Sequence, residues 1–129
     1  MIIDHFGFGV SDYERAKRFY AQALAPLGIA FVMEVSPEIN ETGWACGFGR
    51  DGKPEFWIGG EGRTTPPMHV AFLASSRAAV RAFHEAALEA GAADNGAPGL
   101  RPHYHPNYYA AFVRDHDGHN FEAVCHAPE

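Results

Sequence analysis

The chain contains His5-Phe-Gly-Phe-Gly-Val-Ser-Asp12 and, 64 residues later, His69-Val-Ala-Phe-Leu-Ala-Ser-Ser76. The alignment of these two segments continues without gaps, and it pairs Phe19 with Phe83. A spacing close to half the chain length is typical of an internal duplication. The sequence therefore predicts one domain of 129 residues built from two tandem copies, at about 1–60 and 67–127.

Each copy has the hydrophobic pattern of one strand, one helix and three further strands. The first helix is predicted to begin at Ser11, which forms a capping box with Glu14, and to end near Leu24. The second is predicted to run from Ser75 or Ser76 to Gly91. The strands are expected at 2–10, 29–35, 44–50, about 54–58, 69–74, about 98–102, 108–114 and 119–126. The fold class is therefore α+β, with two βαβββ modules whose sheets can close around a shared concavity.

The composition excludes several classes of function. The chain has 10 basic and 16 acidic residues, a net charge of −6, which disfavours nucleic acid and anionic membranes as partners. Its apolar runs are too short to span a membrane, and its first residues do not resemble a secretory signal. The two cysteines, Cys46 and Cys125, are too few for a disulfide framework. We therefore expect a cytoplasmic protein with a small-molecule substrate.

Three residues are candidate metal ligands. His5 and His69 occupy the same position at the start of the two copies, so a symmetric arrangement of the copies would bring them together. Glu122 lies among apolar residues of the last predicted strand, and a buried glutamate is normally paired or bound to a metal. Two histidines and one carboxylate suit divalent iron and related metals, and they leave coordination positions open for a substrate.

The repeat also indicates which residue of the first copy corresponds to Glu122. The turns Asp51-Gly52 and Asp117-Gly118 serve as anchors, and four residues after the glycine they lead to Phe56 and Glu122. We therefore expect an apolar side chain, Phe56, at the position equivalent to Glu122 and lining the substrate pocket.

These features resemble the vicinal oxygen chelate superfamily, which includes glyoxalase I, extradiol dioxygenases, fosfomycin-resistance thiol transferases and bleomycin-binding proteins. The resemblance covers essentially the whole chain. It implies the glyoxalase/bleomycin resistance/dioxygenase fold and a divalent metal (Fe, Mn, Ni, Zn or Co) on His5, His69 and Glu122. It rests on Asp4-His5, Gly9-Val10-Ser11-Asp12, Phe19-Tyr20, His69-Val-Ala-Phe72 and Asp115-His-Asp-Gly-His-Asn-Phe-Glu-Ala-Val124.

The resemblance implies a glyoxalase-like metalloenzyme of the lyase or isomerase type, acting on a small oxygenated substrate chelated to the metal. Two alternatives stay open: an extradiol-type dioxygenase or thiol transferase of the same superfamily, and a metal-free binding or resistance protein. The expected assembly is a homodimer. The two sheets can close on each other within one chain or across that dimer.

A segment rich in aromatic residues and histidines, 101–109, is expected to lie beside the metal site. Its prolines favour an extended loop, and its side chains offer hydrogen-bond donors, flat apolar surface and a proton carrier. A surface or dimer-contact loop is the alternative. We expect Arg101 to bind an anionic group, His103 or His105 to act with Glu122 as catalytic acid or base, and Tyr108 and Tyr109 to line the pocket.

Overall fold

The computed structural model describes residues 2–129 and contains two βαβββ modules. In each module the first strand is at an edge of a four-stranded sheet and pairs in parallel with the fourth strand. The sheet orders are β1-β4-β3-β2 and β5-β8-β7-β6. The predicted α+β fold is therefore confirmed. The elements are β1 (Phe6–Gly9), α1 (Tyr13–Ala23), η1 (Ala25–Leu27), β2 (Ala30–Val35), β3 (Ala45–Arg50), β4 (Lys53–Gly59), β5 (His69–Leu73), α2 (Arg77–Glu89), β6 (Ala93–Leu100), β7 (Tyr109–Arg114) and β8 (Asn120–Cys125).

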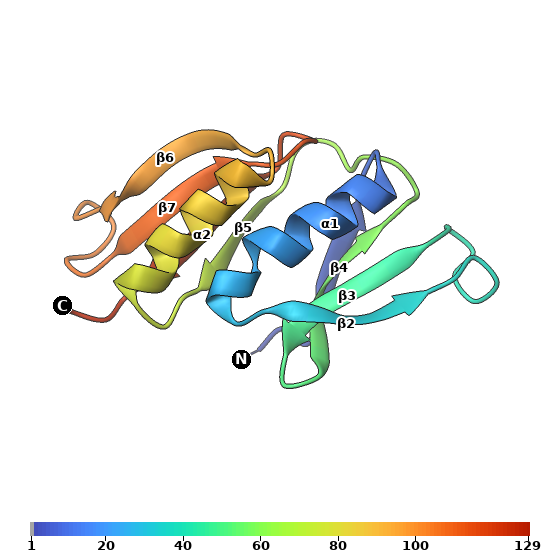
Figure 1. Cartoon of the computed structure of the whole chain (residues 1–129), viewed down its shortest axis with the longest axis horizontal. Coiled ribbons are helices and arrows are strands. Elements are labelled where there is room, and N and C mark those ends of the chain that lie inside the picture. The colour runs from blue at the N-terminus through green and yellow to red at the C-terminus, as the bar shows by residue number, and fades with distance from the viewer. Residues whose placement is uncertain (1) are drawn as a thin grey trace.

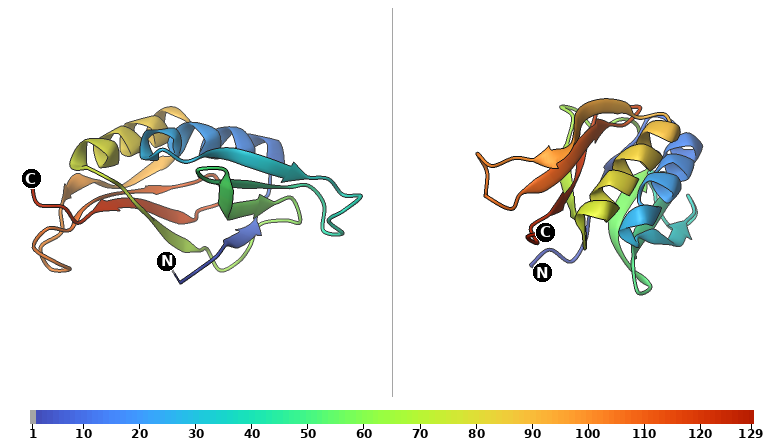
Figure 2. Two further views of the ribbon diagram at one scale, coloured as in Figure 1. Left: turned by 90° about the horizontal axis from the view of Figure 1, so that it is seen from below. Right: turned by 60° about the vertical axis from the view of Figure 1, so that its left-hand side comes forward.

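The two helices form one layer over both sheets. Helices α1 and α2 lie side by side, and the sheets extend away on two sides of this pair (Figure 1). Seen from below, the helices cover both sheets on the same side (Figure 2). Neither helix is long and apolar enough to cross a membrane within residues 2–129.

The cap of the first helix differs from the prediction. Helix α1 is capped by Asp12, whose Oδ1 accepts a hydrogen bond from the backbone N–H of Arg15 at 3.1 Å. Ser11 does not cap the helix because its hydroxyl and its N–H both donate to the Asp117 carboxylate. Helix α2 is capped by Ser76, one of the two predicted caps.

Strand β6 was predicted too short, at 98–102, whereas it spans Ala93–Leu100. The segment contains Gly96, Pro98 and Gly99, and this composition is typical of loops. Its pairing with β7 shifts register around Gly96. Because β6 is at the edge of its sheet, the missing N–H of Pro98 and these irregularities are tolerated there.

Aromatic side chains from both modules meet in one hydrophobic core. The Tyr20 ring on α1 lies 5.1 Å from the Phe56 ring and 4.9 Å from the Phe121 ring. Phe56 in turn lies 5.5 Å from Phe72 and 5.9 Å from Phe121. These side chains project from the core-facing sides of both sheets. Because successive strand residues point to opposite faces, the other face of each sheet carries none of these core side chains.

A buried polar seam also joins the two modules. The Tyr20 hydroxyl donates to the Asp115 carboxylate at 2.5 Å, and the N–H groups of Asp117 and His119 donate to the same carboxylate. The N–H of Ser11 donates to Asp117 at 3.0 Å. Thus the start of α1 and its central tyrosine are both bound to the β7–β8 turn.

The Ser11–Asp117 contact makes stability depend on pH. Burial raises the pKa of Asp117, but the hydrogen bonds from Ser11 and the nearby His119 and Arg15 together outweigh it, and the net pKa lies below the ordinary value. A depressed carboxyl pKa contributes stability above the unfolded value, near 3.9, and this contribution is lost as the pH falls through the folded-state pKa. Replacing Ser11 by Ala is expected to lower the free energy of unfolding by about 1–2 kcal/mol at neutral pH, and by less in acid, once the pH has fallen through the folded-state pKa of Asp117.

Urea denaturation at neutral pH and in acid measures this difference, with Ser36→Ala in the β2–β3 loop as the control. An equal loss at both pH values would show that the Asp117 carboxylate is not the partner that matters.

Candidate functional site

A histidine and a buried carboxylate meet on the open face of the second sheet. His69 is the first residue of β5, and Glu122 lies on the adjacent strand β8. The Nε2 atom of His69 is 3.0 Å from Oε1 of Glu122. The Glu122 side chain is only 3% exposed, whereas that of His69 is 52% exposed. The half-exposed His69 ring therefore lies between solvent and the buried Glu122 carboxylate.

Tyr108 occupies the other oxygen of this carboxylate. Its hydroxyl donates to Oε2 of Glu122 at 2.6 Å. Burial and the neighbouring Glu122 carboxylate raise the pKa of the Tyr108 phenol above its ordinary value. The phenol therefore stays protonated at neutral pH and acts as a hydrogen-bond donor.

His5 lies elsewhere. It precedes β1 at the edge of the first sheet, and its exposed ring pairs with Asp4, Nδ1 to Oδ2, at 2.7 Å. Within residues 2–129, no three His, Cys, Asp or Glu side chains are grouped closely enough to hold a metal ion. One chain thus brings His69 and Glu122 together, but not His5.

The chemistry of His69 and Glu122 fits a divalent metal. Metal bonds to histidine nitrogen and carboxylate oxygen are about 2.0–2.2 Å long, so two such atoms on neighbouring coordination positions lie about 3 Å apart. The separation of Nε2 and Oε1 is 3.0 Å. The pair therefore has the spacing expected of two ligands of the predicted set.

Strand register corrects the equivalence between Phe56 and Glu122. Phe6 pairs with Phe56 in the first sheet, and Val70, its counterpart, pairs with Phe121 in the second. Phe56 therefore corresponds to Phe121, and both face the core. The next residue, Trp57, is the counterpart of Glu122. A Cβ atom on Gly47 would lie 2.9 Å from the Trp57 ring, so the indole packs directly against this glycine.

Phe56 does line a cavity, although on the core side of the sheet. A cleft of about 550 Å³ lies between β1, β4 and β5 and is mostly apolar. On the core side of the second sheet, His119 is fully buried and packs 4.5 Å from the Phe8 ring. The cleft itself is lined by residues of both modules. Its aromatic lining consists of Phe6, Phe48, Phe56 and Phe72.

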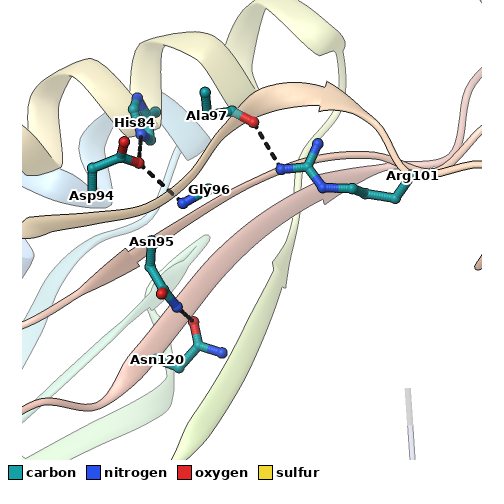
Figure 3. Close-up of polar contacts among 7 residues, drawn as sticks. All are labelled: His84, Asp94, Asn95, Gly96, Ala97, Arg101 and Asn120. Carbon is teal, nitrogen blue, oxygen red and sulfur yellow. Dashed lines mark hydrogen bonds and ion pairs between the residues drawn. The ribbon is translucent and has the colours of Figure 1, made fainter.

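Arg101 is hydrogen-bonded to the preceding strand, β6. Its guanidinium donates to the carbonyl oxygens of Gly99 and Ala97, both at 2.8 Å, and lies 5.3 Å from the centre of the Phe112 ring. Figure 3 shows the bond to Ala97, together with the nearby contact of Asn95 with Asn120 at 3.1 Å. The charge of Arg101 therefore lies beside the open face, while two of its donors hold the end of β6.

The remaining residues of 101–109 lie on two sides of the second sheet. His103 and His105 are exposed, and Nδ1 of His105 accepts a hydrogen bond from the N–H of Asn107. Tyr109 packs against the core, and Arg77 lies 5.1 Å from its ring centre.

His126 was missed by the sequence analysis. Its ring lies 5.2 Å from that of Tyr108 and 5.7 Å from that of His105. Strand alternation offered a signal, because 122, 124 and 126 fall on the same face.

Comparison with known proteins supports this architecture. The family model for the Glyoxalase/Bleomycin resistance protein/Dioxygenase superfamily matches residues 2–123. The chain belongs to this superfamily. As a superfamily member it has the expected two modules, with the first and last strands of each module side by side. A search of curated protein sequences gave no significant match.

Solved structures agree with the superfamily assignment. A glyoxalase/bleomycin resistance protein from Albidiferax ferrireducens T118 is 27% identical, over 99% of this chain and 100% of that chain, with a TM-score of 0.78. Two more distant structures share the fold. A glyoxalase-related enzyme from Fulvimarina pelagi is 20% identical, over 95% of this chain and 86% of that chain (TM-score 0.68). Glyoxalase I from Zea mays is 19% identical, over 95% of this chain and 45% of that chain (TM-score 0.70).

Proposed function

We propose that this superfamily member is a metal-dependent, glyoxalase-like enzyme acting on a small oxygenated substrate. The observation that carries the proposal is the buried Glu122 carboxylate with Nε2 of His69 at 3.0 Å from Oε1. A buried carboxylate needs a compensating partner. Tyr108 is hydrogen-bonded to Oε2, so in this proposal the cation binds at Oε1, beside His69. Fe, Mn, Ni, Zn and Co all accept such ligands.

In this proposal the third ligand, His5, comes from a second copy of the chain. The helices cover only one side of each sheet, so the open face of each sheet is available to another chain (Figure 2). The edge strands β1 and β5 are the ones that carry His5 and His69. Unpaired edge strands readily pair with another chain. A homodimer formed at these edges would bring His5 of one copy to His69 and Glu122 of the other.

Several residues of the chain would then have separate roles in the reaction. A bound divalent metal supplies Lewis acidity toward substrate oxygens. Glu122, or His103 or His105 from the exposed loop, moves a proton of the substrate. Arg101 contributes positive charge beside the open face. Two buried thiols, Cys46 and Cys125, suit the reducing cytoplasm, where we expect this chemistry to take place.

Mixing two inactive variants tests the shared site. His5→Ala and His69→Ala homodimers are each expected to lose tight metal binding, because each lacks a ligand in both sites. Unfolding and refolding them as a mixture forms heterodimers with one intact site and one site lacking both histidines. Metal analysis of the isolated heterodimer should recover about half the wild-type content.

Recovery of no metal in the heterodimer would place the third ligand in the same chain. A His84→Ala plus His69→Ala mixture is the matched control, because His84 lies on α2 and pairs with Asp94.

A second candidate, metal-free binding of an apolar small molecule, is favoured by one observation: the aromatic cleft of about 550 Å³ beside Phe56. Ligand binding that is unchanged after removal of metal by a chelator would support this candidate over the enzyme.

A further inference from the structure

The two oxygens of Glu122 have different partners. Oε2 accepts the hydroxyl proton of Tyr108 at 2.6 Å, whereas Oε1 faces Nε2 of His69 at 3.0 Å. The side chain is almost fully buried, so solvent does not compete for either oxygen. The carboxylate is therefore held in one orientation by a neutral donor on one side and a histidine on the other.

Tyr108 is itself fixed by the loop that carries it. Its carbonyl oxygen accepts a hydrogen bond from the N–H of Arg101 at 2.7 Å, and its N–H donates to the carbonyl oxygen of His105 at 3.1 Å. Its ring packs against the Tyr104 ring at 5.1 Å and the His126 ring at 5.2 Å, in both cases edge to face. The phenol is thus preorganised, because backbone and ring contacts restrain it independently of Glu122.

We propose that Tyr108 is a positioning residue for Glu122: its hydroxyl occupies Oε2, so that only Oε1 is presented toward the metal position beside His69. The inference rests on the proposed function of this site. It is a different role from the one that the sequence suggested for Tyr108, which was to line the substrate pocket.

The physical basis is the freedom of an unrestrained carboxylate. With both oxygens free, the group can rotate or use both oxygens on one cation, and its position then changes. Hydrogen bonds to metal-bound carboxylates remove this freedom, and losing such an outer partner typically costs 10–100-fold in metal affinity. Loss of the Tyr108 hydroxyl also leaves the buried Oε2 without its partner.

The test compares Tyr108→Phe with Tyr104→Phe, using Co²⁺ as the probe. Both variants keep an aromatic ring in the same loop, but only the first removes the hydroxyl that reaches Glu122. We expect Tyr108→Phe to weaken Co²⁺ binding by about 10–100-fold in calorimetry and to change the visible absorption spectrum of the bound Co²⁺. Tyr104→Phe should leave both unchanged. Thermal unfolding of both variants checks that the fold is retained.

A Co²⁺ affinity of Tyr108→Phe within about twofold of wild type, with an unchanged spectrum, would overturn the positioning role. It would do so even if substrate binding were weakened. If the wild-type protein binds no metal, the proposed function fails, and the hydrogen bond is tested in the metal-free protein by NMR. A downfield, slowly exchanging hydroxyl proton, absent in Tyr108→Phe and in Glu122→Ala, is expected; without that signal the inference falls as well.

Discussion

Replacing His69 by alanine is expected to abolish tight binding of divalent metal, which the wild-type protein should hold at about one ion per chain. Nε2 of His69 lies 3.0 Å from the buried Glu122 oxygen. Among the residues that the structure describes, no other His, Cys, Asp or Glu forms a metal-binding group with this pair. Loss of one of three protein ligands removes a third of the proposed protein–metal bonds. We expect the affinity to fall by more than the 10–100-fold typical of outer partners.

Metal content after mild purification and resupply of Fe, Mn, Ni, Zn or Co measures this loss. His84→Ala is the control, since His84 is engaged with Asp94 at 2.9 Å on the helix side. Should the His69→Ala protein retain full metal content, the site would lie elsewhere. Should the wild type hold none after resupply, the metalloenzyme proposal would be refuted and the aromatic cleft would become the stronger candidate.

Replacing Phe56 by glutamate is expected to unfold the protein. The Phe56 ring is buried among Tyr20, Phe48 and Phe121. Removing a core phenylalanine costs about 3–5 kcal/mol, and burying an unpaired carboxylate adds several more. Together these costs approach the whole stability of a typical domain, about 5–15 kcal/mol. Circular dichroism and urea denaturation would show the loss directly.

Trp57→Glu is the variant to compare with Phe56→Glu. Trp57 is the register counterpart of Glu122, on the open face of the first sheet. The new carboxylate is half-exposed rather than buried in the core, so the protein should stay folded. In the proposed dimer it would lie near His5 and complete a four-ligand set, and metal affinity should rise. If Phe56→Glu stayed folded and bound metal more tightly, while Trp57→Glu had no effect, the correspondence of Trp57 with Glu122 would be wrong.

Most of the fold could be predicted from the repeat, and the error in the site came from how the repeat was aligned. The first strands are 64 residues apart and the turn glycines 66, whereas the strands that carry Phe56 and Phe121 are in register at 65. Turns can change length without cost to the sheet, while strand register is fixed by which side chains are buried. Turn anchors therefore misassigned the counterpart of Glu122 by one residue.

Two other differences also have physical reasons. Ser11 has the local pattern of a helix cap, but its hydrogen-bond acceptor, Asp117, is 106 residues away and invisible to a local motif. His69 and Glu122 could be grouped from the sequence, and they are adjacent in the structure. The separation of His5 from them depends on how the modules pack, and the sequence left both arrangements open.

The shared aromatic core has a consequence for how the duplicated chain folds. Phe56 of the first copy is buried by Phe72 and Phe121 of the second, and Tyr20 is hydrogen-bonded to Asp115 across the same boundary. Neither copy encloses its own apolar side chains, so a half-length fragment would expose them to water and aggregate. The chain is therefore duplicated in sequence, but the two copies do not fold independently. Both copies should unfold in a single transition, and a mutation in either one lowers the stability of both.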